Sequence, residues 1–83
     1  MKLVNIGFGN FISLNRLVGI FEIDSAPSKR LVHLGKEKNI LIDATCGRKT
    51  QSILIMDTGN IILSALNTEI ISSKINEEEN NLT

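Results

Sequence analysis

The side chains best suited to chemistry lie in residues 43–50, which read Asp-Ala-Thr-Cys-Gly-Arg-Lys-Thr. Two adjacent cations, Arg48 and Lys49, follow a glycine, and the hydroxyls of Thr45 and Thr50 flank them. Cations, hydroxyls and free loop N–H groups are the donors that attract and fix a phosphate. A short basic step is also common in turns that only face solvent. The segment therefore indicates either a phosphate contact or a plain basic turn.

The other reactive side chains stand apart from one another. Arg16 is either a further phosphate contact or an ordinary solvated arginine at the start of a strand. His33 has no nucleophile or carboxylate beside it in a catalytic arrangement, and we expect it on the surface of a helix. Cys46 has no neighbouring base, and one cysteine with one histidine cannot fill a zinc site. We therefore expect no enzyme activity, cofactor, metal or small-molecule substrate.

The apolar pattern predicts a small α+β domain with two helices and a largely antiparallel sheet. Ser25 and Pro27 mark the start of the first helix, and Asn39 marks its end. Gly35 falls in the middle of this helix, where a close contact with another element would explain it. The expected helices cover residues 26–38 and 68–75, and the expected strands cover residues 3–6, 11–13, 17–23, 40–43, 51–56 and 61–66.

Turn residues separate these elements. Residues 7–10 predict a turn that needs positive φ, and residues 57–60 supply the Asp, Gly and Asn of a tight hairpin. The strand over residues 17–23 is apolar enough to be buried. Residues 1–75 form one domain, and residues 76–83, which are acidic and rich in asparagine, predict a disordered tail.

Size and charge limit what a single copy can do. A chain of 83 residues buries only about 60–65% of the surface that its unfolded form exposes. One cysteine excludes an internal disulfide, so we expect oligomerisation to add stability. All nine basic residues and six of the nine acidic residues precede residue 77, which gives that part a net charge of +3. Several copies together would bind a polyanion far better than one copy.

Four segments in order resemble the RemA (extracellular matrix regulatory protein) family, over residues 2–75. They are residues 5–10 (Asn-Ile-Gly-Phe-Gly-Asn), 24–30 (Asp-Ser-Ala-Pro-Ser-Lys-Arg), 43–50, and 55–64, which runs from Ile-Met-Asp to Leu-Ser. The resemblance implies a cytoplasmic bacterial regulator whose founding relative activates biofilm-matrix genes. It also implies a fold related to the LytTR DNA-binding domain and a ring-shaped homo-oligomer.

The resemblance implies that the ring contacts or wraps double-stranded DNA, with Arg16, Arg48 and Lys49 on its phosphates. Two positions depart from the family pattern, since Lys49 stands where the family has a second arginine and Gln51 where a basic residue often follows. Lysine lacks the planar fork that binds phosphate with two parallel bonds, so we expect weaker binding.

Two other functions fit the same composition. The chain could be an oligomeric scaffold that binds a protein, with its basic loop left in solvent. It could also bind RNA, although Phe8, Phe11 and Phe21 are its only aromatic residues and supply few stacking surfaces for single strands. No signal peptide or membrane span is evident, so we expect a cytoplasmic protein without a membrane partner.

Overall fold

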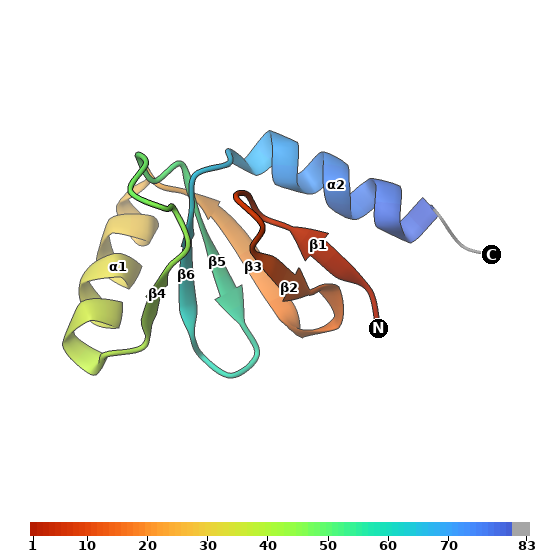
Figure 1. Cartoon of the computed structure of the whole chain (residues 1–83). Coiled ribbons are helices and arrows are strands. Elements are labelled where there is room, and N and C mark those ends of the chain that lie inside the picture. The colour runs from red at the N-terminus through yellow and green to blue at the C-terminus, as the bar shows by residue number, and fades with distance from the viewer. Residues whose placement is uncertain (81–83) are drawn as a thin grey trace.

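The computed structural model describes residues 1–80, which form an α+β domain of two sheets and two helices (Figure 1). The predicted α+β class with two helices is confirmed. The strands and the first helix form within two residues of their expected bounds, and the second helix is longer. In chain order the elements are β1 (Leu3–Asn5), β2 (Phe11–Ser13), a 3-10 turn (Leu14–Arg16), β3 (Leu17–Glu22), α1 (Ala26–Lys38), β4 (Leu41–Asp43), β5 (Ser52–Met56), β6 (Ile61–Ser64) and α2 (Thr68–Asn80).

The larger sheet has the strand order β3-β5-β6-β4, and β1 pairs with β2 in a separate antiparallel hairpin. The β3–β5 and β5–β6 pairs are antiparallel, as predicted, but β4 pairs with β6 in parallel. This follows from the connections. The chain leaves β4, crosses to β5, and returns through the hairpin so that β6 inserts between them, running in the same direction as β4.

The core has two parts, one on each face of the larger sheet. Neighbouring residues of β5 point to opposite faces, as alternation along a strand requires. Ile53 packs with Ile61 and Leu63 beneath α1, whereas Leu54 packs with Ile62 beneath the β1–β2 hairpin and α2. Figure 1 shows the resulting layers, with α1 on one side of the sheet and the hairpin and α2 on the other.

The prediction that the strand over residues 17–23 is buried is wrong. β3 is an edge strand of the larger sheet, with Val18 69% exposed and Phe21 38% exposed. The structure places α1 against β4 and β6, toward the other edge, so α1 does not cover β3 and these side chains stay partly exposed. The apolar run in the sequence did not reveal which strand would lie at the edge.

The ends of α1 form as their residues predict. The Ser25 hydroxyl accepts the Ser28 N–H at 3.3 Å, and Asn39 ends the helix in the left-handed conformation with φ 56°. The close contact expected at Gly35 is also confirmed. A Cβ there would lie 3.0 Å from Leu41 Cδ1 and 3.3 Å from Ile61 Cδ1, so any larger residue would force these side chains to shift.

We expect Gly35→Leu to lower the free energy of unfolding by about 2–3 kcal/mol, because the new side chain would overpack this contact. The matched control is Lys36→Leu at the next, exposed position, which should stay within about 0.5 kcal/mol of the original protein. Urea unfolding measures both. Equal effects of the two substitutions would show that α1 does not pack against the sheet through Gly35.

The second helix is longer than predicted. It was expected to end at Ile75 and to be followed by a disordered tail over residues 76–83, but α2 continues to Asn80. Glutamate is a good helix former, and the Lys2 ammonium donates to the Glu78 carbonyl at 3.0 Å, which holds the last turns beside β1. The helix therefore ends five residues later than predicted, within the segment expected to be disordered, and residues 81–83 of that segment lie outside the described part.

Candidate functional site

The segment that carries Arg48 and Lys49 begins with a tight turn at the end of β4. Asp43 Oδ1 accepts the Thr45 N–H at 2.9 Å and the Thr45 hydroxyl at 2.6 Å. The Arg48 N–H then donates to the Thr45 carbonyl at 3.1 Å, across Cys46 and Gly47, whose φ angles are 53° and 80°. Positive φ at both central residues is the geometry of a type I′ turn. Arg48 at the end of this turn and Lys49 directly after it are both exposed.

The turn between β1 and β2 is built in the same way. Asn5 Oδ1 accepts the Gly7 N–H at 2.7 Å, and the Asn10 N–H donates to the Gly7 carbonyl at 3.1 Å. The two central residues, Phe8 and Gly9, have φ angles of 56° and 79°, which confirms the predicted positive-φ turn. Phe8 thus occupies the position that Cys46 occupies in the other turn.

These two turns, residues 5–10 and 43–48, lie against each other, and we call them the turn pair. The Asn10 side-chain amide donates to the Ala44 carbonyl at 3.1 Å and to the Gly7 carbonyl at 3.0 Å, so it joins them. The Arg48 guanidinium carbon lies 4.3 Å from the centroid of the Phe8 ring. The N-terminal hairpin is therefore part of the same surface as the basic loop.

Phe8 and Asn10 were not singled out as site residues from the sequence. One signal was present, because Asn5 and Asp43 are each followed by a glycine four positions later, at Gly9 and Gly47. A side-chain acceptor followed by a glycine at fixed spacing is typical of a tight turn, so the two segments were recognisable as similar turns. Their contact with each other was not recognisable.

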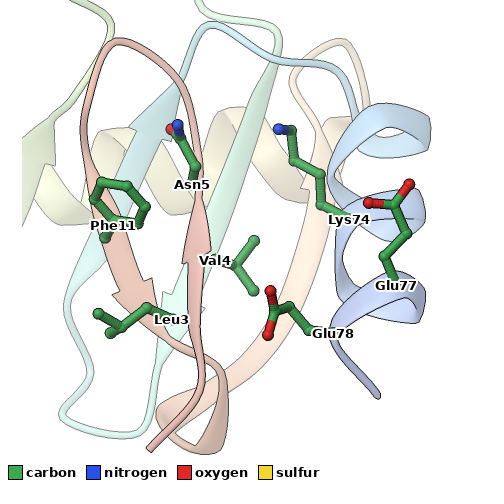
Figure 2. A pocket seen from close by; sticks show the side chains of 7 residues that line it. All are labelled: Leu3, Val4, Asn5, Phe11, Lys74, Glu77 and Glu78. Carbon is green, nitrogen blue, oxygen red and sulfur yellow. The ribbon is translucent and has the colours of Figure 1, made fainter. Parts of the chain in front are cut away.

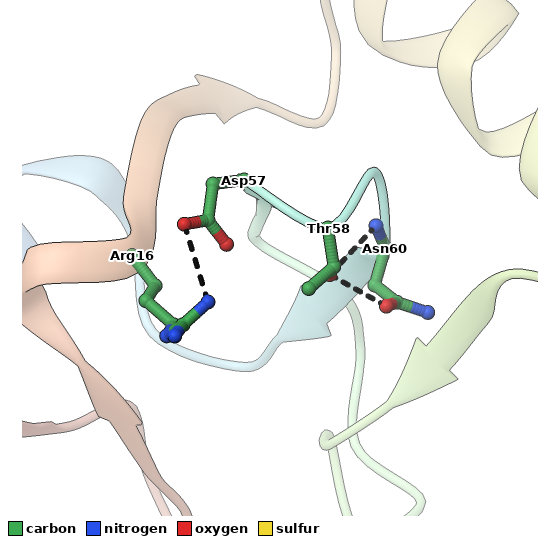
Figure 3. A network of polar contacts seen from close by, with 4 residues as sticks. All are labelled: Arg16, Asp57, Thr58 and Asn60. Carbon is green, nitrogen blue, oxygen red and sulfur yellow. Dashed lines mark hydrogen bonds and ion pairs between the residues drawn. The ribbon is translucent and has the colours of Figure 1, made fainter.

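Arg16 lies at the opposite end of the larger sheet from Arg48 and Lys49. Its carbonyl accepts the Asp57 N–H at 2.8 Å, and its guanidinium forms an exposed ion pair with the Asp57 carboxylate at 3.5 Å (Figure 3). The length of β5, at about 3.3 Å per residue, separates the two ends by about 17 Å. One subunit therefore does not bring the three predicted DNA-binding residues together.

Arg48 and Lys49 are not neutralised by the described part of the protein. Within residues 1–80 the ion pair is Arg16 with Asp57, and His33 contacts Glu37, so both loop cations keep their charge available. His33 lies on the exposed side of α1 and contacts Glu37 at 2.9 Å, as expected of a surface residue. The turn pair thus presents Arg48 beside the Phe8 ring, and Lys49 follows directly after it as a second exposed cation.

Two hydrogen bonds from Thr45, first from its hydroxyl and then from its N–H, lower the pKa of Asp43 below 3.8. A carboxyl whose pKa falls on folding stabilises the fold above its unfolded pKa, near 3.9, and loses that contribution as the pH drops through the folded value. We expect carbon NMR to give Asp43 a midpoint below that of an ordinary aspartate, and Thr45→Val to raise it. An unchanged midpoint in the variant would show that the hydroxyl does not contact the carboxylate.

A shallow groove of about 170 Å³ lies between the β1–β2 hairpin and α2 (Figure 2). Leu3 and Phe11 approach it from the hairpin, and Lys74, Glu77 and Glu78 from the helix. It is smaller than the roughly 300 Å³ of ordinary small-molecule sites. It offers mixed charges and no reactive arrangement, so we assign it no ligand.

Two further findings concern residues 1–80 only. No helix there is long and apolar enough to cross a membrane. No three His, Cys, Asp or Glu side chains there gather closely enough to hold a metal ion.

Residues 3–75 match the model of a protein family described as RemA-like, extracellular matrix regulatory protein A-like. A protein of Dictyoglomus thermophilum is 55% identical over 75 residues, which cover 90% of this chain and 88% of that one. One of Acetivibrio thermocellus is 48% identical over 79 residues, 95% of this chain and 85% of that one. A protein of Bacillus pumilus is 44% identical over 79 residues, which cover 95% of this chain and 89% of that one. All three carry a name that designates a candidate regulatory protein.

Proposed function

We propose that this chain is a regulator that binds double-stranded DNA in the cytoplasm. The chain belongs to the RemA-like family, whose description is extracellular matrix regulatory protein A-like. The observation that carries the proposal is the pair of exposed cations, Arg48 and Lys49, that no carboxylate within residues 1–80 neutralises. A free guanidinium and a free ammonium, presented by a rigid turn, are suited to phosphate oxygens. On the family description we extend the proposal to genes of the extracellular, or biofilm, matrix.

Arg16 supplies the second contact of each subunit. The span of about 17 Å between the two ends of the sheet exceeds the roughly 12 Å width of the major groove. Arg16 at one end and Arg48 with Lys49 at the other can therefore meet the phosphate backbones on the two sides of a groove. Such contacts position the protein without reading bases, so sequence preference would come from the bendability of the DNA.

The active form is a homo-oligomer, which we propose to be a ring of LytTR-related subunits. A domain of charge +3 binds DNA weakly, and repeated copies multiply its contacts. The surface supports self-association, because it exposes Val18 (69%), Phe11 (58%) and Ile42 (48%), which are large apolar side chains on strand edges or on the hairpin. A monomer of this size has little core to compensate for such exposure.

A salt series tests this function. We expect purified protein to bind a fluorescent duplex tightly at about 50 mM salt and much more weakly at about 200 mM. The slope of log affinity against log salt concentration is proportional to the number of phosphates that the protein contacts. Light scattering on the same sample gives the subunit number. Affinity that stays constant across the series would contradict a function based on phosphate contacts.

A protein-interaction scaffold is the second candidate, and the exposed apolar residues Val18 and Phe11 favour it. It differs in its response to salt, because an apolar interface changes little over the range in which phosphate contacts are lost. A folded, oligomeric protein that fails to bind the duplex even at low salt would support the scaffold and reject the DNA-binding regulator.

A further inference from the structure

We infer that Phe8 is a positioning residue for DNA binding, whose ring holds the Arg48 guanidinium in place to contact a phosphate. The inference rests on the DNA-binding function proposed above and adds to it a residue from the N-terminal hairpin. It makes the turn pair, and not the basic loop alone, the unit that meets the DNA.

The contact leaves the donors of Arg48 available. The guanidinium carbon lies 4.3 Å from the Phe8 ring centroid, a distance at which the cation is attracted to the ring face. A guanidinium is planar, and its five N–H donors point outward in that plane. A guanidinium carbon that lies over the ring leaves N–H donors at the edge of the guanidinium for phosphate oxygens.

The backbone fixes the Phe8 ring where Arg48 needs it. Phe8 sits between Gly7 and Gly9 at φ 56°, held by the Asn5 bond to Gly7. Leu66 packs behind the turn, where a Cβ on Gly7 would lie only 3.3 Å from Leu66 Cγ. The Asn10 amide then joins this turn to the Ala44 carbonyl, so the ring and the cation belong to one rigid unit.

Folding alone does not explain an aromatic residue at position 8. A positive φ is unfavourable for a bulky side chain, and glycine or asparagine would suit the turn better. The Phe8 side chain is also 47% exposed and is not part of either core cluster. Within residues 1–80 the ring makes a cation contact with Arg48.

A held arginine binds better than a free one, because less side-chain freedom is lost when the phosphate arrives. At an exposed site, a cation–ring contact corresponds to an effect of about two- to fivefold on affinity. We expect this factor for each subunit on the DNA, so several subunits together would enlarge it. Lys49 has no such partner within residues 1–80, which makes Arg48 the better-positioned of the two cations.

The test compares Phe8→Leu, which keeps apolar bulk without an aromatic face, with Phe8→Tyr and Phe8→Trp, which keep the face. We expect Phe8→Leu to bind duplex DNA about two- to fivefold more weakly per engaged subunit, and the two aromatic variants to bind as tightly as the original protein. Because the chain has no other Trp, the Phe8→Trp fluorescence should also change when DNA binds. Thermal unfolding and subunit number of each variant control for folding.

A double variant, Phe8→Leu with Arg48→Ala, shows whether Phe8 acts on DNA binding through Arg48 or through a general effect on the fold. We expect the effect of Phe8→Leu to vanish when Arg48 is absent. A Phe8→Leu protein that binds like the original, or a loss that persists without Arg48, would overturn the inference while leaving the DNA-binding function intact. If Arg48→Ala alone leaves binding unchanged, the proposed role of Arg48 fails, and this inference fails with it. Should Phe8→Leu not fold, weak binding by a folded Phe8→Trp protein would overturn the inference.

Discussion

Replacing both loop cations, Arg48→Ala with Lys49→Ala, is expected to weaken binding to duplex DNA by about a hundredfold or more. Each charge-assisted contact contributes about 1.5 kcal/mol or more, and every engaged subunit would lose two of them. The slope of log affinity against log salt should also fall by about two for each such subunit. Fluorescence anisotropy across a salt series measures both quantities.

The matched control is Lys36→Ala with Lys38→Ala, which removes the same charge from exposed positions in the last turn of α1. These lysines lie at the end of α1 far from the turn pair (Figure 1), so the control should retain most of the affinity and the steep salt slope. If the two double variants weaken binding equally, net charge and not the turn pair determines DNA affinity. If neither weakens it, Arg48 and Lys49 are not contacts.

The largest effect on stability is expected from Ile71→Ala in α2. Ile71 is fully buried against the hairpin and the larger sheet, and its replacement by alanine leaves a cavity that costs about 3 kcal/mol. A domain of this size has a total stability of about 4–12 kcal/mol. The melting temperature should therefore fall by more than about 10 °C. Calorimetry or urea unfolding would measure the loss.

Ile70→Ala is the control for this prediction, because Ile70 is the preceding residue of the same helix and is 43% exposed. It should change stability far less than Ile71→Ala. The opposite order of effects would mean that the outer face of α2, and not its inner face, makes the stabilising contacts.

Local signals in the sequence were sufficient for much of the fold. Ser25, Pro27 and Asn39 fixed the ends of α1, because capping and left-handed termination depend on residues within a few positions. The hairpin over residues 57–60 and the turn over residues 7–10 formed for the same reason. Gly35 even indicated where α1 approaches the sheet.

What could not be predicted depends on neighbours distant in sequence. Whether β3 is buried depends on its place at the edge of the sheet, which its own residues do not encode. The parallel pairing of β4 depends on β6 inserting next to it. The extension of α2 to Asn80 depends on α2 packing beside the hairpin, where Lys2 reaches Glu78, in a segment whose composition alone favours disorder.

The candidate site also has parts that the sequence predicts locally and parts that only the fold reveals. Arg48 and Lys49 were predicted together because they are adjacent, and the structure exposes both, one at the end of the turn and the other directly after it. The contact between Phe8 and Arg48 joins residues forty positions apart, so only the fold reveals it. For Arg16 the sequence left open a phosphate contact or a solvated strand-end arginine, and the family resemblance favoured the contact. The structure places Arg16 at the other end of the sheet.

Hydrogen exchange with and without duplex DNA tests the DNA-binding surface most directly, because it reports on every segment of the assembled protein. Saturating DNA should slow exchange in peptides that cover the turn pair, residues 5–10 and 43–48, and at Lys49 and Arg16, while α1 stays unchanged. Slower exchange confined to α1 or α2, or no change at all under conditions where DNA is bound, would contradict the account.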